Sequence, residues 1–218
     1  RDGYVEHDSS KSETWMDTLR RDMRAVEIQA LCLKAFGSAG RLLGTGNPGD
    51  RGMMKEIESR SSSLRKGFDR DFFRNGFFGD RLKDGLDETR TANALVPLIC
   101  SLDTRRKEVL GMIESGRFST RRGVRTRAEG EHGYDPSGYH TGSAWSLTTA
   151  WASAAEFASG RPEKGRGYLR MLLEDIDRDA LGCIGECWDS SGLGQMGSPL
   201  QLWGSGFVPR LVDEFMLG

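Results

Sequence analysis

Apolar residues recur along this chain at the three- and four-residue spacing of amphipathic helices, and glycine-rich stretches separate the periodic segments. In the segment 19–43, one helix face would carry Val26, Leu31, Leu33 and Phe36. The same pattern predicts helices over residues 53–73, 93–101, 104–115, 145–158, 164–180 and 199–216. No run of alternating residues indicates a strand. The pattern therefore predicts an all-α chain of about seven helices.

Two segments stand out by their composition. Residues 145–158 are rich in alanine and tryptophan and carry few charges, which is typical of a helix buried on most sides. Residues 116–139 form a long, charged connection that contains several glycines, and loops of this length inside a compact domain are often functional. We therefore expect the chemistry of this protein at helix ends and in loops.

The charge balance and the length exclude some classes of protein. At 218 residues the chain fits one domain. Its 31 basic and 32 acidic residues nearly cancel, so we expect no nucleic-acid partner, because such a partner normally requires a basic excess. No apolar run is long enough for a membrane span and no signal peptide is recognisable, which predicts a cytoplasmic protein. The chain opens on Arg1, so we expect residues upstream of it.

The cysteines and histidines give no sign of a metal site. The four cysteines form no close CxxC pair, and at this size they indicate reduced thiols: Cys32, Cys100, Cys183 and Cys187. The three histidines do not stand at a familiar ligand spacing from them. We expect no metal and no organic cofactor.

Two short stretches, far apart in the chain, place a carboxylate beside tryptophan. Trp15 and Asp17 lie near the start, and Glu186 and Trp188 lie near the end. Glycoside hydrolysis uses two carboxyl groups, one to protonate the leaving oxygen and one to activate water, and flat aromatic faces stack on sugar rings. The pattern therefore indicates a glycosidase.

The residues around these carboxylates resemble the catalytic region of the amylo-α-1,6-glucosidase domains of glycogen debranching enzymes. The chain reads TWMD at 14–17 and VEIQAL at 26–31, where that family has a TWMD word followed by a VEI(N/Q)AL helix. Later stretches are similar to the family's remaining motifs in the same order: 87–93, GVRT at 123–126, YHTGSAW at 139–145, IGE at 184–186 and GSPLQLW at 197–203. The series covers nearly the whole chain, which makes the resemblance specific.

The resemblance implies an (α/α)6 toroid, in which six helical hairpins surround a funnel that holds the active site. Twelve helices are needed, and about seven are predicted here. At an average helix length of about 11–12 residues plus connections, 218 residues cannot easily form all twelve. Residues 1–218 would then be the C-terminal part of a single glycosidase catalytic domain. The N-terminal part of the same domain would be its partner and would cover an exposed apolar flank.

By resemblance, Asp17 is the general acid and Glu186 the general base. Desolvation by Trp15 and Met16 would raise the pKa of Asp17, although an aspartate at this place could also cap the following helix. Asp189 is a second candidate for the base. An inverting mechanism requires the two carboxyl groups to be about 6.5–9.5 Å apart, whereas about 5 Å would indicate a nucleophile and a retaining mechanism.

A group of polar and aromatic residues is expected to bind the sugar. Planar polar side chains that donate and accept hydrogen bonds in pairs suit sugar hydroxyls. The candidates are Trp15, Arg24, Glu27, Gln29, Arg125, His140, Trp145, Trp188, Gln201 and Trp203. Glu27 could instead be a surface charge that pairs with Arg24. Among the tryptophans, Trp188 is expected in the site and Trp151 in the core.

The function implied by the resemblance is hydrolysis of the α-1,6-linked glucose left on a trimmed, branched α-glucan. Trp145-Ser146-Leu147 departs from the Trp-Pro-Trp common in the family, so an aromatic platform is missing and the substrate could differ from glycogen. Two alternatives therefore stay open. One is a toroidal glycosidase of another linkage, such as a glucoamylase-like, trehalase-like or oligosaccharide-trimming enzyme. The other is a carbohydrate-binding fragment without activity.

Overall fold

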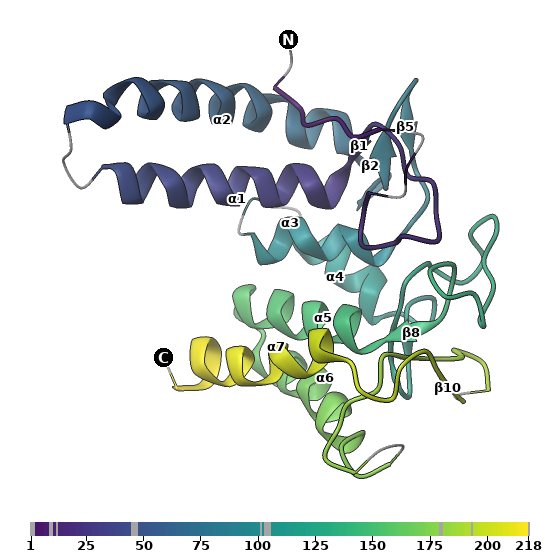
Figure 1. Ribbon diagram of the computed structural model, residues 1–218. Coiled ribbons are helices and arrows are strands. Elements are labelled where there is room, and N and C mark those ends of the chain that lie inside the picture. Colours follow the sequence, from purple (N-terminus) through teal and green to yellow (C-terminus); the bar gives the residue numbers. More distant parts are fainter. Residues whose placement is uncertain are drawn as a thin grey trace.

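The computed structural model describes residues 3–8, 11, 13–44, 48–100, 102, 106–178, 181–192 and 194–217. Within these ranges the fold is mostly helical, and its helices lie in stacked layers (Figure 1). The α-helices are α1 (Val26–Leu43), α2 (Arg51–Phe72), α3 (Leu95–Ile99), α4 (Arg106–Glu114), α5 (Ser146–Ala158), α6 (Pro162–Glu174) and α7 (Leu202–Val212). Short 3-10 turns span Pro48–Asp50 and Ala92–Ala94, and a π-helical turn spans Asp213–Leu217. No helix in the described ranges is both long and apolar enough to cross a membrane.

Small antiparallel sheets gather at one end of the helices, on the right in Figure 1. One sheet has the order β1-β4-β5, another β10-β9-β8-β7-β6, and β2 pairs with β3. The strands are β1 (Arg24–Ala25), β2 (Phe73–Arg74), β3 (Phe77–Phe78), β4 (Arg81–Leu82), β5 (Leu86–Asp87), β6 (Ser119–Thr120), β7 (Gly123–Arg125), β8 (Ala144–Trp145), β9 (Cys187–Trp188) and β10 (Gln195–Met196). The all-α expectation is therefore wrong in this respect. Strands of two or three residues are too short to show the alternation by which a strand is recognised in sequence.

Every predicted helical segment contains a helix, but the boundaries differ. The helix predicted to start near Leu19 starts at Val26, because the chain before it takes an irregular path in which Met23 has a φ of 71°. That path turns the side chain of Arg21 into the interior. The helix predicted over 164–180 runs from Pro162 to Glu174, and residues 179 and 180 lie outside the described part.

The core lies where the helix layers meet. Phe68 and Phe72 of α2 pack with Phe78 of β3. The ring centroid of Phe68 lies 5.2 Å from that of Phe72 and 5.7 Å from that of Phe78. Helix α5 contacts α3, α6 and α7, and eleven of its thirteen residues are buried. The prediction of a helix buried on most sides is thus confirmed for this segment. Leu31 was expected on the apolar face of α1, but it is exposed.

Candidate active site

The carboxylate of Glu186 is held in one position by three hydrogen-bond donors. Tyr139 donates its hydroxyl to Oε1 at 2.5 Å, Gln201 donates its amide to Oε1 at 2.9 Å, and the backbone N–H of Ser198 donates to Oε2 at 2.8 Å. The backbone of Glu186 is fixed as well, because its N–H donates to Ser198 O at 2.9 Å and its carbonyl accepts from Ser146 N at 3.0 Å. Both the side chain and the main chain of this residue are therefore positioned.

These contacts also determine the charge of Glu186. Burial alone would raise the pKa of its carboxyl, but the hydrogen bonds from Tyr139, Ser198 and Gln201 stabilise the charged form and lower the pKa below its ordinary value. Conversely, burial and the neighbouring Glu186 raise the pKa of Tyr139, which keeps its phenol protonated as a donor. At neutral pH the site therefore contains an ionised carboxylate that can accept a proton.

Asp17 lies close to His140, the residue that follows Tyr139. Its Oδ1 is 3.9 Å from His140 Nδ1, and the His140 and Tyr139 ring centroids are 4.6 Å apart. Burial lowers the pKa of His140 to about 4, so this histidine is neutral at pH 7 and forms no ion pair with Asp17. The hydroxyl of Thr18 is within hydrogen-bond distance of the same nitrogen, at 2.8 Å. A short series of contacts thus connects the two predicted catalytic carboxylates.

The surroundings of Asp17 differ from the expectation. Its side chain is 70% exposed, so Trp15 and Met16 do not remove it from solvent. Met16 is fully buried, and Trp15 donates its indole N–H to Asn93 Oδ1 at 2.7 Å. The predicted desolvation of Asp17 by these two neighbours is therefore wrong for the described part of the chain.

Aromatic rings form the wall beside the two carboxylates. The Trp15 ring contacts His140, Trp145 and Trp151 edge-on, with centroids 5.3, 5.6 and 5.2 Å away. Trp145 stacks on His140 at 5.0 Å and donates its N–H to Tyr139 O at 2.7 Å, but it is itself buried. An open pocket of about 440 Å³ adjoins this wall and is lined by Trp15, Leu147, Trp151, Trp203, Gly206, Phe207 and Arg210.

The structure changes the expected placing of two tryptophans. Trp188 was expected to stack on sugar, but its ring is completely buried, with Arg122 packed 4.7 Å above it. Trp151 was expected in the core and does pack against it, but it is only partly buried and also lines the open pocket. Trp203 also lines this pocket and is 46% exposed.

Three of the expected sugar-binding residues have other partners. Arg24 pairs with Glu6 at 2.5 Å rather than with a site residue. Glu27 is buried in an ion pair with Arg21 at 2.5 Å, so it is neither a surface charge nor a free sugar ligand. Gln29 is fully buried, where it accepts from Val5 N and donates to Val5 O, both at 2.8 Å.

Two further polar candidates, Arg125 and Asp189, organise the loops near Glu186. Arg125 donates to Gly116 O at 2.7 Å and to Ser190 Oγ at 3.1 Å. Asp189 accepts hydrogen bonds from Ser137, the backbone of residue 192 and Ser191, and these bonds lower its pKa. Asp189 is thus bound to loop residues, whereas Glu186 contacts Tyr139, whose neighbour His140 lies 3.9 Å from Asp17.

A buried ionic network, absent from the sequence expectations, supports the segment that carries Asp17. Arg21 is bound between Asp80 (2.6 Å) and Glu27, and Asp80 also accepts from Thr91 at 2.7 Å and Asn93 at 2.9 Å. Burial alone would raise the pKa of Asp80, but Arg21 outweighs it and lowers that pKa. Because Asn93 also binds Trp15, the network fixes the aromatic wall.

The family model described as the mannosylglycerate hydrolase MGH1-like glycoside hydrolase domain matches residues 14–203. The chain belongs to this glycoside hydrolase family. A search of curated proteins returned no match.

Solved structures with the same fold are similar to this chain at low sequence identity. A GH63 mannosylglycerate hydrolase from Thermus thermophilus, in complex with glucose, has a TM-score of 0.71 and 15% identity over 91% of this chain and 50% of that one. An uncharacterised conserved protein from Thermus thermophilus has a TM-score of 0.70 and 16% identity over 85% and 45%. A structure described as a sialidase has a TM-score of 0.73 and 16% identity over 96% and 21%.

This chain therefore has part of the six-hairpin glycosidase fold and spans about half the length of the GH63 structures. The match supports the predicted class of glycoside hydrolase family and the predicted partial toroid, to which the structure adds small sheets. It gives no support to glycogen debranching in particular. Among the described residues, no group of three or more histidine, cysteine, aspartate and glutamate side chains could hold a metal ion, and all four cysteines are free thiols.

Three functional candidates in this chain were missed from sequence. Tyr139, which binds Glu186, stands directly before His140 in the YHTGSAW stretch and could have been selected from that position. Arg21 and Asp80 gave no signal, because an ion pair between distant residues looks like two ordinary surface charges in a sequence.

Proposed function

We propose that this chain carries the general acid and the general base of an inverting glycosidase, with Glu186 as the base and Asp17 as the acid. The observation that supports this most is the Glu186 carboxylate, which three donors hold in its ionised form. Asp17 lies 3.9 Å from His140, in a position open to solvent and therefore to a ligand.

In the proposed reaction, Glu186 takes a proton from a water molecule as that water attacks the anomeric carbon. Asp17 gives its proton to the glycosidic oxygen, so the alcohol leaves neutral and the sugar is released with inverted configuration. Tyr139 keeps Glu186 oriented and charged throughout. The partly exposed rings of Trp15, Trp151 and Trp203 provide apolar faces on which a sugar ring can stack.

We propose a short glycoside as the substrate rather than a branched polymer. The matching family is described by a mannosylglycerate hydrolase, whose named substrate is a sugar linked to a small acid. The pocket supports the same choice, because Leu147 lines it where the debranching-type glucosidases often have a second tryptophan. Next to Leu147, Ser146 packs closely against Gly204: a Cβ atom added to Gly204 would lie 2.4 Å from the Cβ atom of Ser146.

The test is hydrolysis of two substrates, mannosylglycerate and a singly branched maltodextrin, by the wild-type protein and by Glu186→Gln. Glu163→Gln is the matched control, because Glu163 is 86% exposed on α6. We expect the first substrate to be cleaved, Glu186→Gln to lose at least about 10³-fold in kcat and Glu163→Gln to keep full activity. Proton NMR of the first-formed anomer should show inversion.

Each other outcome identifies a different error. Cleavage of the maltodextrin alone would favour the debranching function. Retained anomeric configuration would reject the inverting roles of Asp17 and Glu186. A folded protein that binds sugar but hydrolyses neither substrate would favour the carbohydrate-binding alternative.

A further inference from the structure

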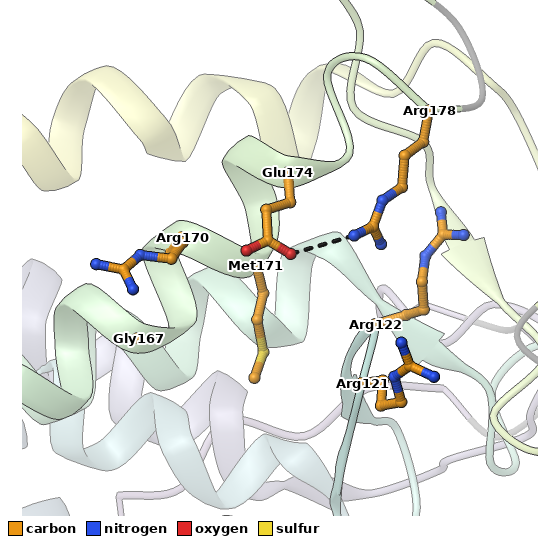
Figure 2. Close-up of a pocket in the computed structure, with 7 residues that line it drawn as sticks. All are labelled: Arg121, Arg122, Gly167, Arg170, Met171, Glu174 and Arg178. Atoms are coloured by element: carbon orange, nitrogen blue, oxygen red, sulfur yellow. Dashed lines mark hydrogen bonds and ion pairs between the residues drawn. The ribbon is translucent and has the colours of Figure 1, made fainter.

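A second pocket, lined by four arginines, lies between the β6–β7 turn and helix α6 (Figure 2). Its volume is about 440 Å³, and it is lined by Arg121, Arg122, Gly167, Arg170, Met171, Glu174 and Arg178. None of these residues belongs to the candidate active site. The two arginines of the turn come from a two-residue hairpin loop between Thr120 and Gly123, and the others come from α6 and the turn that follows it.

The pocket has an excess of positive charge. Arg178 lies 3.2 Å from Glu174, as the dashed line in Figure 2 shows, and 3.8 Å from Asp175. Arg122 contacts Asp175 at 3.0 Å. Of the four guanidinium groups in the pocket lining, those of Arg122 and Arg178 thus pair with two carboxylates, which leaves two positive charges in excess.

Two of the four guanidinium groups are available to a ligand. Arg121 and Arg170 form no hydrogen bond or ion pair within the described part of the chain, and both are exposed. By contrast, Arg122 is held in place by Asp175, whose side chain is buried, and by the Trp188 ring 4.7 Å away. At Gly167 the pocket is open, because a Cβ added there would meet no atom within 4 Å.

We propose that this pocket binds a phosphate group, free or as the monoester of a small organic molecule. A phosphate monoester carries about two negative charges at neutral pH, which matches the charge excess, and the planar guanidinium fork binds phosphate oxygens in pairs. The volume falls within the range of about 300–1,000 Å³ that is usual for small-molecule sites. The pocket therefore has room for an organic group beside the phosphate, in contact with Met171.

The test is isothermal titration calorimetry of the purified protein with inorganic phosphate, glycerol 3-phosphate and glycerol, at constant ionic strength. The variant Arg121→Gln/Arg170→Gln removes the two unpaired guanidinium groups without breaking a contact of the fold. The control Arg65→Gln/Arg166→Gln removes the same charge at exposed positions outside the pocket. Thermal unfolding without ligand should be the same for the wild type and both variants.

We expect saturable binding of both phosphates, no binding of glycerol, and a loss in affinity of at least about tenfold in the pocket variant alone. Tighter binding of glycerol 3-phosphate than of inorganic phosphate would support an ester as the ligand, and equal binding would support free phosphate. The absence of saturable binding at millimolar phosphate would overturn the proposal. So would an equal loss of affinity in the pocket variant and the control, because that result would reflect net charge only. Hydrolysis is not needed for any of these measurements, so the proposed glycosidase activity can fail independently.

Discussion

Gly197 gives the sharpest test of how Glu186 is positioned. It has a φ of 64°, and a Cβ at this residue would lie 2.2 Å from Glu186 Oε2 and 3.0 Å from its Cδ. Real Cβ contacts essentially never fall below 3.0 Å, so the carboxylate of a Gly197→Ala variant must move by roughly 0.8 Å or more. That movement separates Oε2 from the backbone N–H of Ser198.

Gly197→Ala should lower both the stability of the protein and its catalytic rate. Alanine in the left-handed region costs about 1–2 kcal/mol of stability, which corresponds to a fall in Tm of roughly 2–8 °C for a chain of this size. A displacement of about 1 Å at a catalytic group can reduce the rate on the order of 100-fold. Loss of the Ser198 hydrogen bond should also raise the pKa of Glu186, so the acidic limb of the pH profile of kcat/KM should move to higher pH.

The assay compares kcat/KM across pH for the wild type, Gly197→Ala and Gly194→Ala. Gly194 is the matched control, because it lies on the other side of β10 only three residues away, has no positive φ, and a Cβ there would meet no atom within 4 Å. The free energy of unfolding of Gly194→Ala should stay within about 0.5 kcal/mol of the wild-type value. If Gly197→Ala keeps the wild-type rate and pH profile, Glu186 is not a base that depends on this geometry, and the reasoning is refuted.

Further predictions concern the acid, the donor to the base and two buried charges. Tyr139→Phe should raise the pKa of Glu186 and move the acidic limb of kcat/KM to higher pH, and an unchanged limb would count against this hydrogen bond. Asp17→Asn should abolish hydrolysis while Tm stays the same, because the side chain is 70% exposed; remaining activity would reject it as the acid. Burial raises the pKa of Glu156 from its ordinary 4.5 to about 7, so the folded state binds the extra proton and the contribution of Glu156 to stability, measured as the difference between the wild type and Glu156→Gln, should fall as pH rises from about 4.5 to 7, by on the order of 3 kcal/mol. Glu156→Gln should remove this slope in denaturant unfolding at several pH values. Arg21→Met should lower the free energy of unfolding by about 3–5 kcal/mol, because it leaves buried carboxylates without a counter-charge, and a loss below 1 kcal/mol would contradict this.

Helices could be predicted from this sequence because they are long and periodic, whereas the strands could not. A strand of two residues has no alternation to detect. One hairpin, however, carries a recognisable turn sequence. Asn75-Gly76 stands between β2 and β3 with φ angles of 50° and 77°, the conformation that Asn-Gly prefers in tight hairpins. That dipeptide could have indicated this hairpin.

The candidate site could be predicted in part, since Asp17, His140, Glu186 and Gln201 lie in one connected group of contacts. What could not be predicted is which way a side chain faces. Trp188 follows Glu186 by two residues but points into the core, because β9 lies in the sheet and packs between the other elements. Motif position places a residue near a site, whereas burial depends on contacts with distant parts of the chain.

The five-stranded sheet has a consequence for the folding of this protein. Two of its four pairings, β7 with β8 and β8 with β9, close long loops of chain. Closing such loops costs entropy before the contacts compensate for it, which places these pairings late in folding. The backbone of Glu186 is fixed by Ser146, which directly follows β8, and by Ser198, which follows β10. During synthesis, helices α1 to α6 can therefore form before Glu186 is held in place, because its carboxylate and backbone partners include Ser198 and Gln201.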